Sequence, residues 1–186
     1  MKKEIVIHIF SKTAQLSSPR LLFRKMNRKD AQDMFDYAKR AEVTKYLLWH
    51  EHKDLAYTKR YLAYVETCYR AGSFFDFALV DKASGKMIGT CGFTRLDYAN
   101  DAAEIGYVLH PDYWNKGLAT EAVQTIMEYG FKTLGLHRIE ARYMKDNTAS
   151  RRVMEKCGMQ PEGIHHHLML IKGCYEDIGI YAKIKE

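Results

Sequence analysis

The sequence predicts an α/β protein, of the mixed α+β kind, in which a central sheet of about seven strands carries helices on both faces. Strand-like and helix-like segments follow one another in the order β, α, α, β, β, β, α, β, α, β, β, so strands come before, between and after the helices. Capping residues and glycines mark the ends of the longer helical segments. With 186 residues, the chain is most simply one domain over residues 1–186.

In the first third of the chain, residues 4–10 have the pattern of a short extra strand, residues 11–19 that of a loop, and residues 20–26 that of the first strand of the sheet. Asp30 is a good N-cap for the helix that follows. Asp54 caps a longer helix, which Gly72 ends. Residues 42–52 show no clear period.

The rest of the chain supplies the remaining strands and two helices. The expected strands are residues 74–80, 87–95, 102–109, 137–144, 163–171 and 174–184. The first two of them form a hairpin. One helix begins at Gly117 and ends at Gly135, and the next is capped by Asp146 or Asn147 and closed by Gly158.

Composition excludes several classes of protein. No apolar run is long enough to span a bilayer, and the N-terminus lacks the apolar core of a signal peptide, so we expect a cytoplasmic protein without a membrane partner. The four cysteines form no CxxC pair, and neither a zinc site nor a disulfide framework is expected. The formal charge of +6 suits an anionic ligand as well as a nucleic acid.

Residues 104–131 form the stretch around which the rest is organised. An apolar strand stops at Pro111, a polar link follows, and Gly117 opens a helix. The free N–H groups of a helix N-terminus can hold a phosphate, and a glycine lets the anion approach the backbone. Lys116 adds a cation beside it. In isolation this pattern is weak, because many such turns bind nothing.

This segment resembles motif A of the GNAT superfamily, the GCN5-related N-acetyltransferases, whose loop Arg/Gln-x-x-Gly-x-Gly/Ala holds the pyrophosphate of acetyl-CoA. Here the pattern falls on residues 114–119, where Gly117 and Ala119 match. Trp114 stands in place of Arg or Gln, and it is similar to the RimJ/RimL group of ribosomal-protein N-terminal acetyltransferases. A second block, residues 147–159, resembles the family's Asn-x-x-Ser element.

The resemblance implies acetyl-CoA as cosubstrate and a set of positions that contact it. These positions are Val108, Leu109, Trp114, Asn115, Lys116, Gly117, Leu118, Ala119, Thr120, Asn147 and Ser150. In the family a backbone N–H of the central strand, near Val108 and Leu109 here, holds the developing oxyanion. The first two helices border the acceptor groove in the family. Candidate acceptor contacts there are Trp49, His50, His52, Tyr57 and Tyr61, although packing on the sheet is the favoured interpretation of the two tyrosines.

Two residues are candidates for catalysis. Glu104 lies among apolar neighbours on the central strand, where a carboxylate is a stronger base than in water, and family members use a glutamate on this strand. The alternative is an ion pair with Arg95 or Arg142. Met154 occupies the place of the family's usual tyrosine acid, which leaves Ser150 as the acid for the thiolate. The alternative for Ser150 is a hydroxyl bonded to the helix backbone.

The run His165-His166-His167 suggests a metal site, but neighbouring residues of a strand point to opposite faces, so only His165 and His167 would share a side. Two ligands without a carboxylate or cysteine partner are too few for zinc. We therefore expect no metal.

The resemblance implies an N-acetyltransferase whose acceptor is an amine, most simply the N-terminus of a ribosomal protein, with possible ribosome association and a monomeric or homodimeric state. The alternatives are a small-amine acetyltransferase acting on a polyamine or aminoglycoside, a catalytically inactive CoA-binding sensor, and an RNA-associated module that uses the basic surface.

Overall fold

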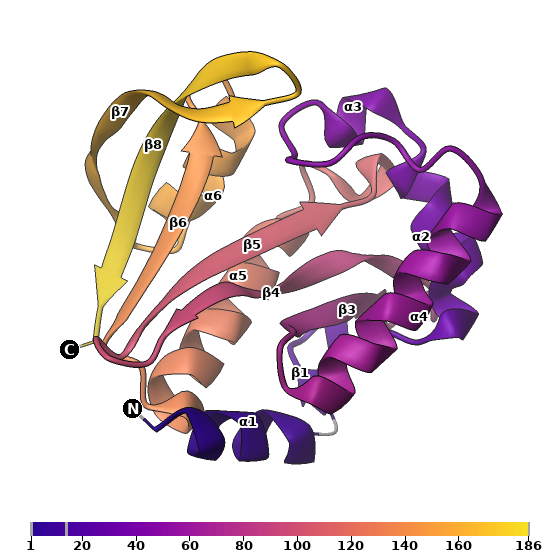
Figure 1. Ribbon diagram of the computed structural model, residues 1–186, viewed down its shortest axis with the longest axis horizontal. Helices are drawn as coiled ribbons and strands as arrows, with labels where there is room; N and C mark the ends of the chain where they lie inside the picture. Colours follow the sequence, from indigo (N-terminus) through magenta and orange to yellow (C-terminus); the bar gives the residue numbers. More distant parts are fainter. Residues whose placement is uncertain (1, 14, 186) are drawn as a thin grey trace.

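The computed structural model describes residues 2–13 and 15–185, and its elements confirm the mixed α/β class (Figure 1). The helices are α1 (Lys3–Lys12), α2 (Ala31–Ala38), α3 (Ala41–Thr44), α4 (Leu55–Ala71), α5 (Leu118–Tyr129) and α6 (Thr148–Lys156). The strands are β1 (Gln15–Ser17), β2 (Leu21–Arg24), β3 (Phe75–Asp81), β4 (Met87–Asp97), β5 (Ala102–Leu109), β6 (Arg138–Met144), β7 (Gln160–Ile171) and β8 (Cys174–Ile184). Among the described residues, no helix combines the length and apolar composition needed to cross a bilayer.

The N-terminal segment corrects two predictions. Residues 4–10 form part of the helix α1 and not a strand, and the stretch expected to be a loop contains the short strand β1, which pairs with β2. Val6 and Phe10, four residues apart, are both buried, and the Phe10 ring lies 5.0 Å from that of Phe77. A short apolar run fits a strand and a helix almost equally, and docking on the sheet selects the helix.

Helix caps follow the sequence in one case and depart from it in another. Asp54 accepts a hydrogen bond from the Tyr57 N–H at 2.6 Å, and Gly72 ends α4 with φ of 64°, both as predicted. Asp30 precedes α2 but does not cap it. Its carboxylate turns back to accept the Asn27 N–H at 2.9 Å and to pair with Arg24 at 2.6 Å. The buried Asp30 therefore fixes the β2–α2 corner.

Over the described residues, the sheet has eight strands in the order β1-β2-β3-β4-β5-β6-β8-β7, one more than the approximate prediction because β1 was not foreseen. Only the β5–β6 pair is parallel among the described strands. Its ladder joins Ala102–Ile105 to Arg138–Ala141 and does not extend over the rest of these two described strands. The C-terminal halves of β5 and β6 thus diverge.

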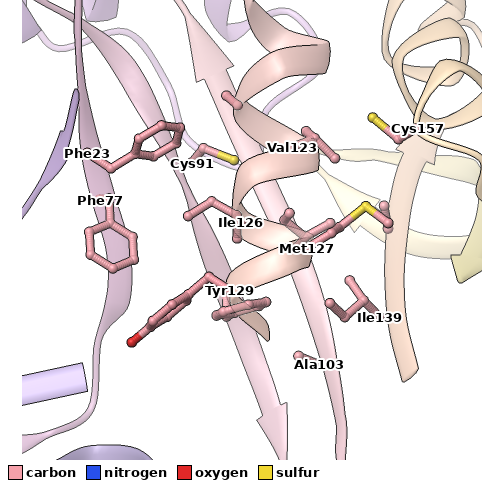
Figure 2. Close-up of a cluster of buried hydrophobic side chains, with 14 of the residues drawn as sticks. Phe23, Phe77, Cys91, Ala103, Val123, Ile126, Met127, Tyr129, Ile139 and Cys157 are labelled. Carbon is pink, nitrogen blue, oxygen red and sulfur yellow. The ribbon is translucent and has the colours of Figure 1, made fainter. Parts of the chain in front are cut away.

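Helices cover both faces of the sheet, each over its own hydrophobic cluster. On one face α5 points Val123, Ile126 and Met127 toward the sheet, where Cys91 of β4 and Ile139 of β6 are also buried (Figure 2). On the other face α2 and α4 pack over β3 and β4. The packing of α5 on the sheet fixes the position of its N-terminus relative to β5.

Asp76 of β3 makes the stability of the fold depend on pH. Burial raises its pKa to about 7, against hydrogen bonds from Thr90 and the Phe77 N–H. Because the folded state then binds more protons than the unfolded chain, stability is highest below about pH 4 to 5 for this group and falls as pH rises toward 7.

We expect the free energy of unfolding to decrease by on the order of 2 to 3 kcal/mol between pH 5 and pH 8 through this group. Asp76→Asn should remove that decrease, as urea unfolding across the range would show. Asp97→Asn is the matched control, because hydrogen bonds from Asn100 lower the pKa of Asp97 and it does not titrate in this window. An equal pH slope in wild type and Asp76→Asn would contradict the assignment.

Candidate active site

A cleft of 630 Å³ opens where β5 and β6 diverge. It lies between the end of β5, the loop into α5, the first turns of α6 and the segment that begins with α3. The predicted positions Val108, Leu109, Trp114, Asn115, Gly117, Leu118, Ala119, Thr120, Asn147 and Ser150 line it. The fold therefore brings together two motifs that lie about 30 residues apart in the sequence.

The loop between β5 and α5 has the backbone that its residues favour. Pro111–Tyr113 forms a 3₁₀ turn, and Asn115 and Gly117 adopt φ of 59° and 76°. Asparagine and glycine are the residues that tolerate this left-handed region best. Gly117 thus turns the chain so that the free N–H groups of α5 face the cleft.

Trp114 has a structural task in this loop. Its indole Nε1–H donates to the Leu109 carbonyl at 2.7 Å, so the side chain connects the loop to the end of β5. The family's Arg or Gln at this position is thereby replaced by a hydrogen bond that holds the loop. The Lys116 ammonium lies 5.4 Å from the centre of the Tyr113 ring.

Arg20 supports the same loop from β2's side, a role that the sequence did not indicate. Its guanidinium donates to the Lys116 carbonyl at 2.8 Å and pairs with Glu121 of α5 at 2.7 Å. Local patterns cannot reveal such a contact, because almost 100 residues separate the partners. It fixes the loop relative to the first turn of α5.

The sequence left two backbone N–H groups, those of Val108 and Leu109, as candidate donors to the oxyanion. Because N–H groups along an extended strand alternate between its two edges, the structure can distinguish them. The His110 N–H donates to the Ile88 carbonyl of the β4 side at 2.7 Å, so the Val108 N–H also faces β4. The Leu109 N–H and C=O face the opposite edge, where the cleft lies, and the carbonyl accepts Trp114 there. Leu109 is therefore the better candidate donor.

The first turn of α6 holds Ser150. Asn147, not Asp146, caps the helix, and its Oδ1 accepts the Ser150 N–H at 3.1 Å. The Ser150 hydroxyl lies 2.7 Å from the hydroxyl of Tyr107, which reaches it from β5. Met154 is buried in the core at 1% exposure.

Tyr107 is a cleft residue that sequence reasoning missed. The signal was present, because Ala103, Ile105 and Tyr107 alternate along β5 and so face the side on which α5 and α6 lie. Burial raises the pKa of its phenol. It accordingly stays protonated at neutral pH.

Glu104 lies on the opposite face of β5 from Tyr107, beside charged residues and not only the apolar ones expected from its neighbours in sequence. Its carboxylate is 3.3 Å from Arg142, one of the two arginines that the sequence offered as partners, and Arg142 also contacts Glu140 at 3.1 Å. Glu104 is not among the described residues that line the cleft. A proton from the cleft would have to reach it through water.

The aromatic acceptor candidates gather around His52. This buried imidazole lies 5.4 Å from the Trp49 ring, 4.9 Å from Tyr57 and 5.7 Å from Tyr61, and its Nδ1 is 2.8 Å from the Thr58 hydroxyl. Such a cluster supports the packing interpretation. The part of this N-terminal region that does line the cleft is the segment just before these candidates, namely Glu42, Val43, Lys45, Tyr46 and Leu47.

The three histidines of β7 do not alternate as a regular strand would. A bulge follows His165, and His167 has φ of 51°, so the regular alternation on which the sequence placed at most His165 and His167 on one side is interrupted here. The His166 ring and the His167 N–H both contact the carboxylate of Asp177. These bonds lower the pKa of Asp177 to about 2. Across the described residues, no three His, Cys, Asp or Glu side chains are placed to hold a metal.

The charge of the cleft is positive. Its described lining contains three cations and a single carboxylate, that of Glu42. The cations are Lys45, Arg152 and Lys156, and the predicted Lys116 is not among the described residues of this lining. Together with the helix N-terminus, they favour an anionic ligand such as a nucleotide pyrophosphate.

Comparison with known proteins identifies the family. The model of the acetyltransferase (GNAT) domain matches residues 20–160. An uncharacterized N-acetyltransferase, p20 of Bacillus licheniformis, is 35% identical over 91% of this chain and 96% of its own. The [ribosomal protein uS5]-alanine N-acetyltransferase of Escherichia coli is 28% identical over 88% of this chain and 87% of its own.

A solved structure agrees with these relatives in fold. The GNAT acetyltransferase from Bacillus anthracis superimposes with a TM-score of 0.81 at 30% identity, over 91% of this chain and 98% of that one. The resemblance seen in the two sequence motifs is confirmed, and GNAT acetyltransferases use acetyl-CoA as the acetyl donor. This chain belongs to the GNAT family of N-acetyltransferases.

Proposed function

We propose that this enzyme transfers the acetyl group of acetyl-CoA to the N-terminal amine of a protein, with a ribosomal protein as the first candidate. The observation that carries the proposal is the positive cleft, which suits the cosubstrate and disfavours a polycationic acceptor. The relative that acts on an alanine of ribosomal protein uS5 supports the same acceptor class. An acceptor on the ribosome would place the enzyme in the cytoplasm.

In this proposal the two substrates react directly within one ternary complex. The pyrophosphate binds to the N–H groups at the start of α5, and the thioester lies between Leu109 and Ser150. The amine nitrogen attacks the thioester carbon, the Leu109 N–H stabilises the oxyanion, and Ser150 faces the departing sulfur. Glu104 receives the proton of the amine through water.

A polyamine acceptor is less well supported because the carboxylates near Glu104 are already neutralised. Glu104 pairs with Arg142, Glu140 with Arg95, Arg138 and Arg142, and Glu162 with Arg138. A spermidine-type substrate needs carboxylates that are free to hold its several charges. An enzyme that binds acetyl-CoA but acetylates nothing would instead be a sensor.

Thermal unfolding with acetyl-CoA tests the cosubstrate. A ligand present at about 100 times its dissociation constant stabilises the folded state by roughly 2.7 kcal/mol. For a chain of this length, the midpoint should rise by about 5 to 10 °C. An unchanged midpoint at saturating acetyl-CoA would contradict the proposal and favour the RNA-associated alternative.

The acceptor is tested by release of the CoA thiol with a panel of amines. We expect turnover with a peptide that has a free N-terminal alanine and none with its Nα-acetylated copy, which is the matched control. Faster turnover of spermidine than of every free peptide would favour the small-amine alternative. Acetyl-CoA binding without acetylation of any amine would favour the sensor.

A further inference from the structure

Two hydroxyl groups meet inside the cleft in a way that bears on the departing sulfur. The Tyr107 oxygen lies 2.7 Å from Ser150 Oγ and 3.1 Å from the Ser150 carbonyl oxygen. Tyr107 comes from β5 and Ser150 from the first turn of α6, and both residues line the cleft. Because each hydroxyl has one hydrogen, two arrangements keep the hydrogen bond between the two hydroxyls.

The arrangements differ in where the serine hydrogen points. If Tyr107 donates to the Ser150 carbonyl, Ser150 Oγ can donate to Tyr107, and both hydrogens are used within the pair. If Tyr107 donates to Ser150 Oγ, the serine hydrogen is free for a third partner. Backbone Ser150 N–H is already bonded to Asn147, so the residue itself is fixed and only its hydroxyl turns.

We propose that Tyr107 is a positioning residue that donates its phenolic hydrogen to Ser150, so that the Ser150 hydroxyl directs its own hydrogen at the sulfur leaving group of acetyl-CoA. This inference rests on the proposed function. The tyrosine acid that the family usually carries on this helix is replaced by the buried Met154, and a hydroxyl from β5 reaches Ser150 in the first turn of the same helix.

The pair acts through hydrogen bonds and both hydroxyls keep their hydrogens. As the bond from the amine nitrogen to the acetyl carbon forms, the carbon–sulfur bond breaks and its electron pair stays on sulfur. The amine loses one proton to the base, and water later protonates the thiolate. Transfer of the Ser150 proton to the sulfur would leave a serine alkoxide. If Tyr107 then gave its own proton to that alkoxide, Tyr107 would become a phenolate, which burial disfavours.

A double-mutant cycle tests the coupling. Tyr107→Phe should lower kcat about fivefold, the effect of one hydrogen bond, and leave the KM for acetyl-CoA within about twofold. Ser150→Ala should lower kcat by about tenfold or more. The double variant should match Ser150→Ala within about twofold, because Tyr107 acts only through Ser150. The readout is CoA release with the best peptide of the panel, and with water as acceptor if no peptide reacts.

The control is Tyr129→Phe. Tyr129 is a buried tyrosine whose hydroxyl lies 2.9 Å from the Thr13 hydroxyl, against α1 and outside the cleft lining. Tyr129→Phe also loses one hydrogen bond between two hydroxyl groups, and this variant should keep wild-type kcat. A Tyr107→Phe effect that persists in the Ser150→Ala background, or that falls on KM or melting temperature alone, would overturn the proposal.

The pH profile separates positioning from proton donation. If Tyr107 keeps its proton, Tyr107→Phe lowers kcat by the same factor from pH 6 to pH 9. Loss of an alkaline limb in the variant would show that Tyr107 itself titrates, and would overturn the positioning role. Failure of the proposed function has different signatures: a wrong cosubstrate gives no thermal shift of the wild type with acetyl-CoA, and a wrong acceptor gives turnover of spermidine, or of no amine, in the panel.

Discussion

Glu104→Gln is expected to lower kcat by about 100-fold or more while the KM for acetyl-CoA stays near that of the wild type. A general base contributes on the order of 10² to 10⁴ to a rate, and glutamine has the shape of glutamate but cannot take a proton. Glu104 is on the face of β5 opposite Tyr107, so it can act from the acceptor side while Ser150 acts on the sulfur. Steady-state kinetics with a peptide acceptor measure both constants.

Glu140→Gln is the matched control for this prediction. Glu140 is the register partner of Glu104 on β6 and contacts the same arginine, Arg142. Its replacement removes ion pairs from the same group of charged side chains on β5 and β6 without removing the proposed base. If both variants lose activity equally, these charged side chains are needed for structure or charge and not for proton transfer. If Glu104→Gln retains full turnover, Glu104 serves only as the ion-pair partner of Arg142.

Two helical segments were placed correctly because a capping residue or a glycine marks each of their ends. The helix α4 has Asp54 before it and Gly72 after it, and the helical segment from Gly117 closes at Gly135 in the left-handed conformation. The error at residues 4–10 arose where neither end carried a signal. There, burial of Val6 and Phe10 against the sheet determines the structure, and no local pattern records it.

The candidate site was predictable where it depends on short motifs. The loop residues and the Asn147–Ser150 turn were predicted from their resemblance to two family motifs, and the structure shows that Asn115, Gly117 and Asn147 also suit the local backbone. The contacts of Arg20 and Tyr107 were missed because each depends on a partner that only the folded chain brings near. The contact of Trp114 is local, since Leu109 is five residues away, but the sequence does not show where the indole points. For Glu104 the sequence left two interpretations open, a base among apolar neighbours and an ion pair with Arg95 or Arg142, and the structure shows the contact with Arg142.

The second large effect is expected at Gly117, where valine should weaken acetyl-CoA binding by about 10-fold to 100-fold. Gly117 has φ of 76°, which a β-branched residue strongly disfavours. An added Cβ would stand 3.5 Å from the Arg20 guanidinium, which connects Lys116 to Glu121. The variant should therefore disturb the loop and cover the N–H groups on which the pyrophosphate depends.

Gly135→Val separates lost binding from backbone strain. Gly135 has the same φ of 76°, ends the same helical segment, and has no atom within 4 Å of an added Cβ among the described residues. Both variants should lose about 1 to 2 kcal/mol of unfolding free energy, because each forces an L-residue into the left-handed region. Only Gly117→Val should raise the dissociation constant for acetyl-CoA in calorimetric titration. If Gly135→Val weakens binding as much, the loss comes from general strain, and the loop at Gly117 is not where the anion binds.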